Sequence, residues 1–306
     1  MTTVVDRMTD AVGGLTDAEI ASFRQNGFAG PFDLYEPEDA VRRWNKAKIE
    51  MVLSRNKPHD STIINYDRHL DCATLSEHIA RPEIVSRVRS LIGPDILCWK
   101  TNIFPKNPGE AGTGWHQVEA FVVGETTTAV TPSLRYTEEP KLVTSEITVW
   151  TAFTNADRAH ACMTFIPGSH KRWYYDETKP MTRNVESKTH DFFGYDYSEL
   201  KIDKDWDPNA EDWIAMELKA GQFVIFLAKC VHGSLPNTSN EMRMGFASRY
   251  VAPSVKVYEN VTELAEFGDR IDLSYHGCVL VSGQDRYGHN RLHAKNLNGV
   301  PFAVMP

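Results

Sequence analysis

Residues 112–123, GTGWHQVEAFVV, have the pattern of a β-strand that carries a metal-ligating side chain, His116. Side chains at positions i and i+2 of a strand project from the same face, so residue 118 is expected to face the same cavity as His116. An iron site of two histidines and one carboxylate would place Asp or Glu at that position. The residue there is Val118. The stretch therefore has the frame of an iron site without its carboxylate.

A second histidine, His232, lies where the apolar segment of GQFVIFLAKCVHGSLPN gives way to a turn. The next expected strand, RMGFASRYV, places Arg243, Gly245, Ala247 and Arg249 on one face by strand alternation. A buried guanidinium needs an anionic partner because an unpaired buried charge is costly. A dicarboxylate cosubstrate would supply that partner through a bidentate contact. The alternative is an exposed strand face with two solvated arginines.

Helices are expected to precede the strands that carry these residues. Thr16 and Glu19 have the spacing of a capping box at the start of a helix. A second helix is expected to turn Val41, Trp44 and Ile49 toward the core, and Pro82 is a suitable first-turn residue for a third. The three expected helices cover residues 15–27, 37–53 and 82–93.

After residue 94 the sequence changes to short segments that are rich in β-branched and aromatic residues and are separated by Gly, Pro and Asn. Strands are expected over residues 95–104, 146–154, 163–166, 222–228 and 243–251. Many short strands with turn residues between them are typical of a β-sandwich or barrel. Two long insertions, residues 125–143 and 170–212, interrupt the series, and long loops in a compact domain are usually functional.

The bulk composition excludes several classes of function. A net charge of −8 without a concentrated basic stripe disfavours nucleic-acid binding. The longest apolar runs, such as residues 223–228, are too short to span a bilayer, and the first residues lack the pattern of a signal peptide. We therefore expect a cytoplasmic protein that does not bind membranes. The five cysteines are scattered, which predicts reduced, mostly buried thiols.

Several longer stretches resemble the phytanoyl-CoA dioxygenase superfamily of iron(II) and 2-oxoglutarate dependent oxygenases. They are LTDAEIASFRQNGF, GWHQ followed by EAF, FIPGSH, VHGSLPN and the trailing Arg243. Within that superfamily, TGWHQ, EITVWTAFTNA, FIPGSHKRWYYDETKPMT, FFGYDYSELKID and EMRMGFASRYV are similar to the non-haem iron halogenase of syringomycin biosynthesis. The resemblance runs from about Leu15 to about Arg291. It implies one domain over residues 1–306, with N-terminal helices over about 15–93 and an all-β core over about 95–306, a double-stranded β-helix of the jelly-roll, cupin-like type.

The resemblance also implies roles for individual residues in binding the metal and the cosubstrate. His116 and His232 correspond to the two iron(II)-binding histidines of the superfamily. Arg243 corresponds to the arginine that binds the distal carboxylate of 2-oxoglutarate. Thr113 and Trp150 correspond to positions that line this cosubstrate. The implied reaction consumes O2 and 2-oxoglutarate.

Further positions correspond to the halide and substrate regions of the halogenases. Thr148 and Arg249 match positions near the halide and its water network. Phe192 and Phe193 match a lid over the tethered side chain, although an ordinary hydrophobic anchor for a long loop is an alternative. Val123 stands where the syringomycin enzyme has an asparagine near chloride. Together with Val118, this apolar lining predicts a small aliphatic amino acid as the substrate.

Val118 decides which reaction the resemblance implies. In hydroxylases the carboxylate at this position fills one place on iron, whereas in halogenases the position is Ala or Gly and chloride fills the vacancy. Val118 agrees with the halogenases because it cannot ligate iron, but it is bulkier than Ala or Gly. One alternative remains within the same stretch, because a β-bulge would rotate Glu119 inward to complete a carboxylate triad.

Three functions follow from this set of residues. The first is a halogenase that chlorinates an amino acid held on the phosphopantetheine arm of a carrier protein, a partner whose usual acidity would require a local basic patch such as Lys171 and Arg172. The second is a hydroxylase, or another oxidative enzyme such as a desaturase, that acts on the same class of substrate. The third is a catalytically silent binding protein.

Overall fold

The computed structural model describes residues 13–59, 65–118, 133–137, 146–176, 179, 196–266 and 269–306. Four α-helices lie in the N-terminal third of the chain: α1 (Asp17–Asn26), α2 (Pro37–Leu53), α3 (Ala73–Ile79) and α4 (Pro82–Ile92). In the ranges just given, four short 3-10 helices cover Arg68–Leu70, Ser169–Lys171, Tyr197–Leu200 and Pro208–Ala210. Three of the four α-helices were predicted from the sequence; α3 was not.

Helix α1 begins and ends as the sequence predicts. The Thr16 hydroxyl accepts a hydrogen bond from the Glu19 backbone N–H at 3.3 Å, and the Glu19 carboxylate accepts one from the Thr16 backbone N–H at 2.7 Å. The two donors satisfied by this capping box would otherwise lack partners at the helix start. Gly27 ends the helix with a φ of 87°, a backbone conformation that favours glycine.

The inward face of α2 differs from the prediction. Trp44 is buried as expected, but Val41 is 39% exposed and Ile49 is 60% exposed. The buried positions are instead Ala40, Trp44, Ala47 and Met51. The two alanines share a face with Trp44 and Met51, and their small side chains allow the helix backbone to approach its neighbours closely.

Two antiparallel sheets form the β core. The larger has six strands in the order β1 (Phe28–Asp33), β8 (Gln222–Leu227), β5 (Glu146–Ala152), β10 (Arg243–Val251), β2 (Ile96–Lys106) and β14 (Val279–Ser282). The smaller has four strands in the order β3 (Thr113–His116), β9 (His232–Ser234), β6 (Met163–Phe165) and β7 (Ile214–Met216). Two small ribbons pair β11 (Lys256–Val257) with β4 (Leu134–Arg135), and β12 (Glu263–Glu266) with β13 (Asp269–Asp272).

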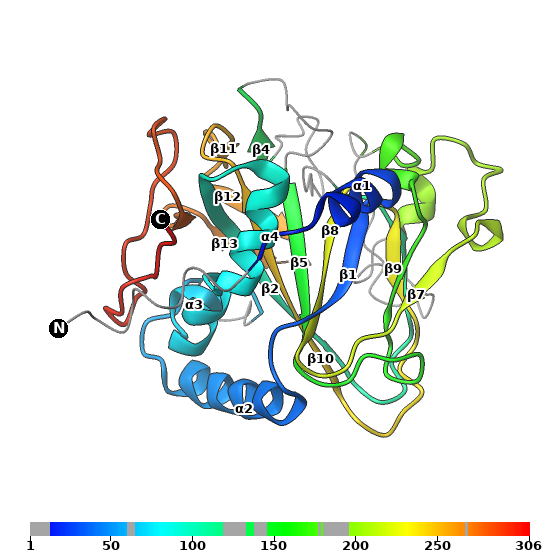
Figure 1. Ribbon diagram of the computed structural model, residues 1–306, viewed down its shortest axis with the longest axis horizontal. Helices are drawn as coiled ribbons and strands as arrows, with labels where there is room; N and C mark the ends of the chain where they lie inside the picture. Colours follow the sequence, from blue (N-terminus) through cyan, green and yellow to red (C-terminus); the bar gives the residue numbers. More distant parts are fainter. Residues whose placement is uncertain are drawn as a thin grey trace.

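The position of a strand between the layers explains why some strands are buried along their whole length. Helices α2, α3 and α4 lie on one side of the large sheet, and β7 and β9 of the small sheet lie on the other (Figure 1). Strands β5 and β10 are central in the large sheet and are buried along their whole length, as expected for strands covered on both faces. This arrangement of antiparallel sheets confirms the predicted all-β core with flanking helices. Strand β1, which the sequence did not predict, joins the large sheet at one edge.

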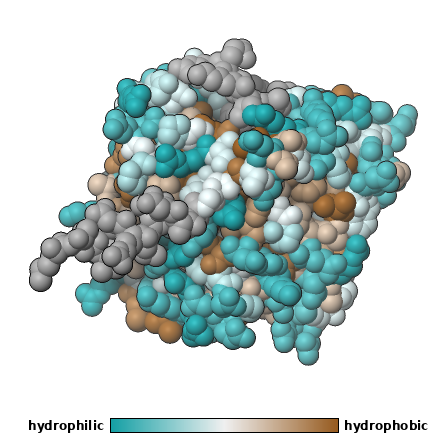
Figure 2. All heavy atoms as spheres, viewed as in Figure 1, coloured by the Kyte–Doolittle hydropathy of each residue, from teal (hydrophilic) through white to brown (hydrophobic). Residues whose placement is uncertain are grey.

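The surface is mostly hydrophilic, and the cysteines have the buried, reduced form that the sequence predicts. Hydrophilic side chains cover most of the face shown in Figure 2, with hydrophobic residues scattered among them. All five cysteines are buried and unpaired. Within the described ranges, no helix has both the length and the apolar character needed to cross a bilayer.

Two buried histidines make the stability of the fold depend on pH. Burial lowers the pKa of His69 to about 4 and that of His78 to about 3. His69 contacts the Thr101 hydroxyl at 2.8 Å, and His78 contacts the hydroxyls of Tyr35 and Thr151 at 3.0 and 3.2 Å. Both rings are therefore buried in the neutral form near neutral pH.

We expect the free energy of unfolding to fall as the pH drops from about 6.5 to about 4, because the unfolded chain takes up protons in this range and the folded chain does not. Each histidine contributes a loss of about 1.4 kcal/mol per pH unit. Urea unfolding at about pH 7 and about pH 5 measures the slope. His69→Gln should reduce the slope and the exposed control His289→Gln should leave it unchanged. Equal stability at both pH values would contradict this expectation.

Candidate active site

The two histidines singled out in the sequence lie directly opposite each other on adjacent strands. In the pairing of β3 with β9, His116 stands opposite His232, and Thr113 stands opposite Ser234. The two imidazole rings have centroids 4.1 Å apart. Both side chains are buried. The register of two short strands therefore brings together residues that are far apart in the sequence.

Backbone contacts set the tautomer of both rings. The Nδ1 atom of His116 lies 2.8 Å from the carbonyl of Gly114, and the Nδ1 atom of His232 lies 2.7 Å from the carbonyl of Cys230. A carbonyl only accepts, so each Nδ1 carries the proton and donates it. The lone pair of each neutral ring then lies on Nε2, the arrangement found in metal-binding histidines whose other nitrogen is held by a hydrogen bond.

Burial also keeps both rings neutral. It lowers the pKa of His232 to about 4, and burial together with the neighbouring His232 lowers the pKa of His116 well below its ordinary value. Neutral imidazole is the ligating form. Two adjacent, neutral imidazoles of fixed tautomer fit a divalent transition metal such as iron(II).

Val118 lies just beyond β3 in an apolar cluster. Its side chain is buried, and its backbone N–H donates to the carbonyl of Ala228 at 3.0 Å. The same cluster contains Ile166, Tyr197 and Val231. Tyr197 also faces His116, with ring centroids 5.5 Å apart, so Val118 belongs to the apolar surroundings of the histidine pair.

The described residues supply no third ligand of the usual kind. Within them, no group of three or more His, Cys, Asp or Glu side chains is placed to hold a metal ion. Four residues named in the sequence analysis fall outside the described ranges, namely Glu119, Val123, Phe192 and Phe193. Among the described residues, the candidate metal ligands are therefore the two imidazoles, and Val118 follows two positions after His116.

Arg243 is a buried cation whose hydrogen bonds go to backbone carbonyls. It donates to Ala161 at 3.0 Å and to Phe104 at 3.3 Å, and its guanidinium lies over the Trp150 ring, 5.1 Å from the centroid. Its Nε atom has no partner in the described structure, and no carboxylate there pairs with it. Burial lowers the pKa of Arg243 to about 10, so it stays charged at neutral pH.

Gly245 makes room for the ring beneath Arg243. A Cβ atom at this position would lie 2.0 Å from an atom of the Trp150 indole, so only glycine allows the ring to lie there. Trp150 stands opposite Ala247 in the pairing of β5 with β10. The predicted alternation of β10 therefore places Arg243 and Gly245 beside Trp150, the residue expected to line the cosubstrate.

Arg249 differs from Arg243 because the protein itself supplies its counter-ion. Its Nε lies 3.4 Å from a carboxylate oxygen of Glu146, and it makes a short hydrogen bond to the side chain of Asn102. Thr148 stands opposite Arg249 in the strand register. Both arginines of β10 are buried, so an exposed face with solvated arginines is excluded. Of the two, Arg243 is the one left to bind an external anion.

Two residues near Arg243 were not predicted. Lys106 stands opposite Arg243 in the pairing of β2 with β10 and is also buried. Its ammonium donates to the hydroxyls of Thr113 and Ser234, at 3.1 and 3.0 Å. The signal for Ser234 was present in VHGSLPN, because it lies two positions after His232 on the same strand. Lys106 is a single lysine just beyond an expected strand, and no motif in the sequence marked it as a site residue.

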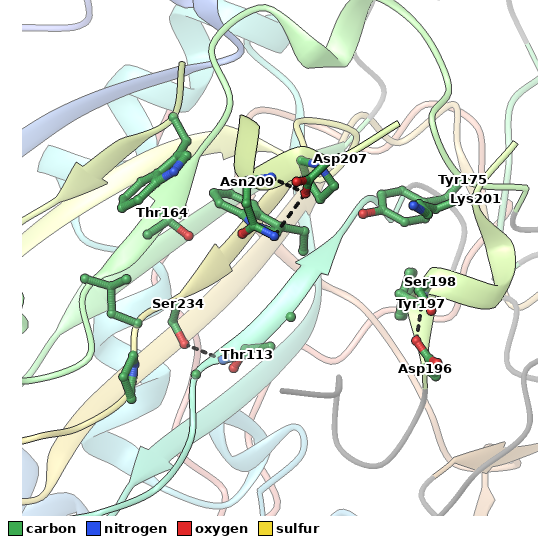
Figure 3. Close-up of a pocket in the computed structure, with 17 residues that line it drawn as sticks. Thr113, Thr164, Tyr175, Asp196, Tyr197, Ser198, Lys201, Asp207, Asn209 and Ser234 are labelled. Atoms are coloured by element: carbon green, nitrogen blue, oxygen red, sulfur yellow. Dashed lines mark hydrogen bonds between the residues drawn. The ribbon is translucent and has the colours of Figure 1, made fainter. Parts of the chain in front are cut away.

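A cavity of about 450 Å³ lies along β3 and β9, the strands that carry the two histidines, although His116 and His232 are not among the residues that line it. Thr113 and Ser234 lie on one side of it, and Tyr197 and Lys201 lie on another (Figure 3). The segment 196–213, which is part of the second long insertion, supplies much of its lining. Tyr197 of this segment also lies beside His116, with ring centroids 5.5 Å apart. That the insertion is functional stays a prediction.

The sequence profile of the phytanoyl-CoA dioxygenase family (PhyH) matches residues 23–245, well over half of the chain. The chain therefore belongs to this family, which confirms the expected superfamily and class of enzyme. A phytanoyl-CoA dioxygenase domain-containing protein 1 homolog of Dictyostelium discoideum is 28% identical over 113 residues. That match covers 37% of this chain and 37% of the relative, so it spans little more than a third of either protein.

Solved structures match over nearly the whole chain. The structure of CytC3 with Fe(II) and alpha-ketoglutarate is 34% identical, has a TM-score of 0.72, and is matched over 96% of this chain and 99% of its own. A second CytC3 structure is 36% identical with a TM-score of 0.71, over 96% and 98%. The non-heme monooxygenase ThoJ in complex with Ni is 20% identical, with a TM-score of 0.62 over 92% of this chain and 89% of its own, and shares the fold.

Proposed function

We propose that the protein is an iron(II) and 2-oxoglutarate dependent halogenase that chlorinates an aliphatic carbon of an amino acid tethered to a carrier protein. The observation that carries this proposal is Val118, an apolar residue beside a pair of metal-competent histidines where hydroxylases have a carboxylate. The similarity to CytC3, which has been solved with Fe(II) and alpha-ketoglutarate, supports the choice of metal and cosubstrate.

In this proposal each residue has a defined task. His116 and His232 hold iron(II) through their Nε2 lone pairs, and the backbone carbonyls of Gly114 and Cys230 keep the rings oriented. Arg243 binds the distal carboxylate of 2-oxoglutarate, which supplies the anionic partner that the guanidinium lacks in the described chain. Bound iron(II) supplies the activation of O2.

Val118 leaves a coordination place to an exogenous anion. If His116 and His232 held iron(II) together with 2-oxoglutarate, the lack of a carboxylate at Val118 would leave room for chloride beside the metal. The second buried arginine, Arg249, with Thr148 opposite it, belongs to the halide region of the proposal, where its ion pair with Glu146 fixes the guanidinium.

A hydroxylase of the same superfamily is the second candidate, and the size of Val118 favours it. Valine fills about the volume of aspartate, and its branched side chain is stiff at χ1. It also packs in an apolar cluster with Ile166 and Val231. If these methyl groups occupied the space that chloride needs, iron(II) held by the two histidines would supply the chemistry of hydroxylation and not that of chlorination.

The proposed substrate is a small aliphatic aminoacyl group on a phosphopantetheine arm. Val118 and the apolar cluster around it favour an aliphatic over a polar side chain. Lys171 and Arg172 are both exposed near the candidate site and provide a local basic surface on a chain with a net charge of −8. Carrier proteins are generally acidic, so this surface is the proposed contact for the carrier.

Intact-mass analysis of aminoacyl carrier proteins tests the proposal. Each carrier substrate is incubated with the enzyme, iron(II), 2-oxoglutarate, O2 and chloride. A product with the isotope pattern of chlorine supports halogenation, and a product that has gained oxygen supports the hydroxylase instead. An unchanged carrier, with 2-oxoglutarate also unconsumed, would contradict both and leave a catalytically silent protein.

A further inference from the structure

Lys106 and Arg243 form a pair of buried cations. They stand directly opposite each other on β2 and β10, with exposed fractions of only 7% and 4%. In the described parts of the chain, neither residue forms an ion pair with a carboxylate. Two adjacent buried charges of the same sign are unfavourable without an anion between or beside them. The pair therefore marks the place where a negatively charged group binds.

The hydrogen bonds of Lys106 show how it would act on such a group. An ammonium has three N–H donors and no acceptor. In Lys106 all three are used, to the Ala111 carbonyl at 2.8 Å, the Thr113 hydroxyl at 3.1 Å and the Ser234 hydroxyl at 3.0 Å. No donor of the ammonium is left to contact a ligand directly. Any effect of Lys106 on the ligand must pass through the two hydroxyl groups.

Both hydroxyl oxygens are occupied as acceptors. Thr113 Oγ1 accepts from Lys106, and Ser234 Oγ accepts from Lys106 and from the backbone N–H of Thr113, at 3.2 Å (Figure 3). The hydrogen atom of each hydroxyl must then point away from Lys106, because a hydroxyl that accepts from an ammonium donates elsewhere. Thr113 and Ser234 are both among the residues that line the cavity of about 450 Å³.

We propose that Lys106 is a positioning residue for the cosubstrate carboxylate, which turns the Thr113 and Ser234 hydroxyls into donors beside Arg243. The inference rests on the proposed binding of 2-oxoglutarate. Arg243 supplies the charge-assisted contact, and the two hydroxyls complete the donor set. A deprotonated Lys106 has one lone pair and would accept from one of these hydroxyls, which turns that hydrogen away from the carboxylate.

The protonation state of Lys106 should change when the ligand binds. Burial, and after it the charge of Arg243, lowers the pKa of Lys106 to about 7. Among the described residues, Glu110 also acts on it and raises the pKa. An anion bound beside the pair favours the ammonium form, so binding of 2-oxoglutarate is coupled to proton uptake. Affinity should therefore fall as the pH rises through neutrality.

Calorimetric titration of 2-oxoglutarate into the anaerobic iron(II) protein tests this proposal without using activity as the readout. From about pH 6 to about pH 8.5, we expect the dissociation constant of the wild type to rise by about tenfold or more, because one proton is linked to binding. Lys106→Met removes the charge at similar length. It should weaken binding about tenfold at the lower pH and abolish the pH dependence.

Other outcomes would overturn the proposal. A wild-type dissociation constant that is the same at both pH values contradicts it without recourse to any variant. Lys106→Met binding that is weaker but keeps the wild-type pH dependence assigns Lys106 a merely structural role. Ser234→Ala retains the Lys106 ammonium and removes one of the two hydroxyls. The pH dependence of its dissociation constant should be reduced, and this variant keeps the proposal testable if Lys106→Met does not fold. A wild type that binds no 2-oxoglutarate at either pH contradicts the proposed function itself, whereas pH-independent binding contradicts only the role of Lys106.

Discussion

Arg243→Leu should weaken binding of 2-oxoglutarate by at least about a hundredfold, the effect of removing one partner of a buried, charge-assisted pair. Leucine retains much of the apolar stem of arginine but removes the guanidinium, which in the described structure contacts two carbonyls and the Trp150 ring. The protein should still fold, because the lost hydrogen bonds go to the backbone carbonyls of Ala161 and Phe104 and not to another charge. Calorimetric titration of the anaerobic iron(II) protein measures the loss.

Two further variants make this result specific. Arg243→Lys keeps the charge but loses the planar fork that matches a carboxylate, so we expect an affinity between those of the wild type and the leucine variant. Arg42→Leu is the matched control, because Arg42 is 70% exposed and its ion pair with Asp39 is within helix α2. Unchanged affinity in Arg243→Leu would show that the buried guanidinium binds no cosubstrate.

Val118→Asp should raise the affinity for iron(II) about tenfold to a hundredfold, the range found when a supporting group of a metal site is gained or lost. Aspartate is close to valine in volume and adds the carboxylate that a two-histidine, one-carboxylate site requires. Chloride should then no longer affect the product, because the protein itself fills the place proposed for the halide. Iron(II) titration and intact-mass analysis of the product measure the two effects.

The melting temperature of metal-free Val118→Asp provides an independent test. Without iron the new carboxylate would lie among Ile166, Tyr197 and Val231, where an unpaired charge is costly. We therefore expect a lower melting temperature for the metal-free variant and recovery when iron(II) is added. Val118→Asn has the same shape without the charge and is the control. If Val118→Asp bound iron(II) no better than Val118→Asn, position 118 would not face the metal.

The parts of the site that sequence reasoning predicted depend on short, local patterns. His116 lies in a stretch with the pattern of a strand, His232 follows an apolar segment, and the alternation of Arg243 with Gly245 along one strand showed which face it occupies. The pairing of β3 with β9 brings the two histidines together, and the pairing of β10 with β5 places Arg243 and Gly245 beside Trp150.

The parts that were not predicted depend on pairings between distant strands. Lys106 has its role only because the register of β2 places it opposite Arg243, and Glu146 pairs with Arg249 across β5 and β10. No pattern within either strand shows such a register. The inward face of α2 was misassigned for a related reason, because packing against its neighbours favours Ala40 and Ala47 over the larger Val41 and Ile49.

The central claim is that iron(II) is held by His116 and His232 without a carboxylate from the protein, so that an exogenous anion completes its coordination. A crystal structure of the protein with iron(II), 2-oxoglutarate and bromide, recorded at the bromine absorption edge, tests it most directly. We predict an anomalous peak for bromide bonded to the metal beside Val118. A carboxylate oxygen of Glu119, or of any other residue, bonded to iron in that place would contradict the claim.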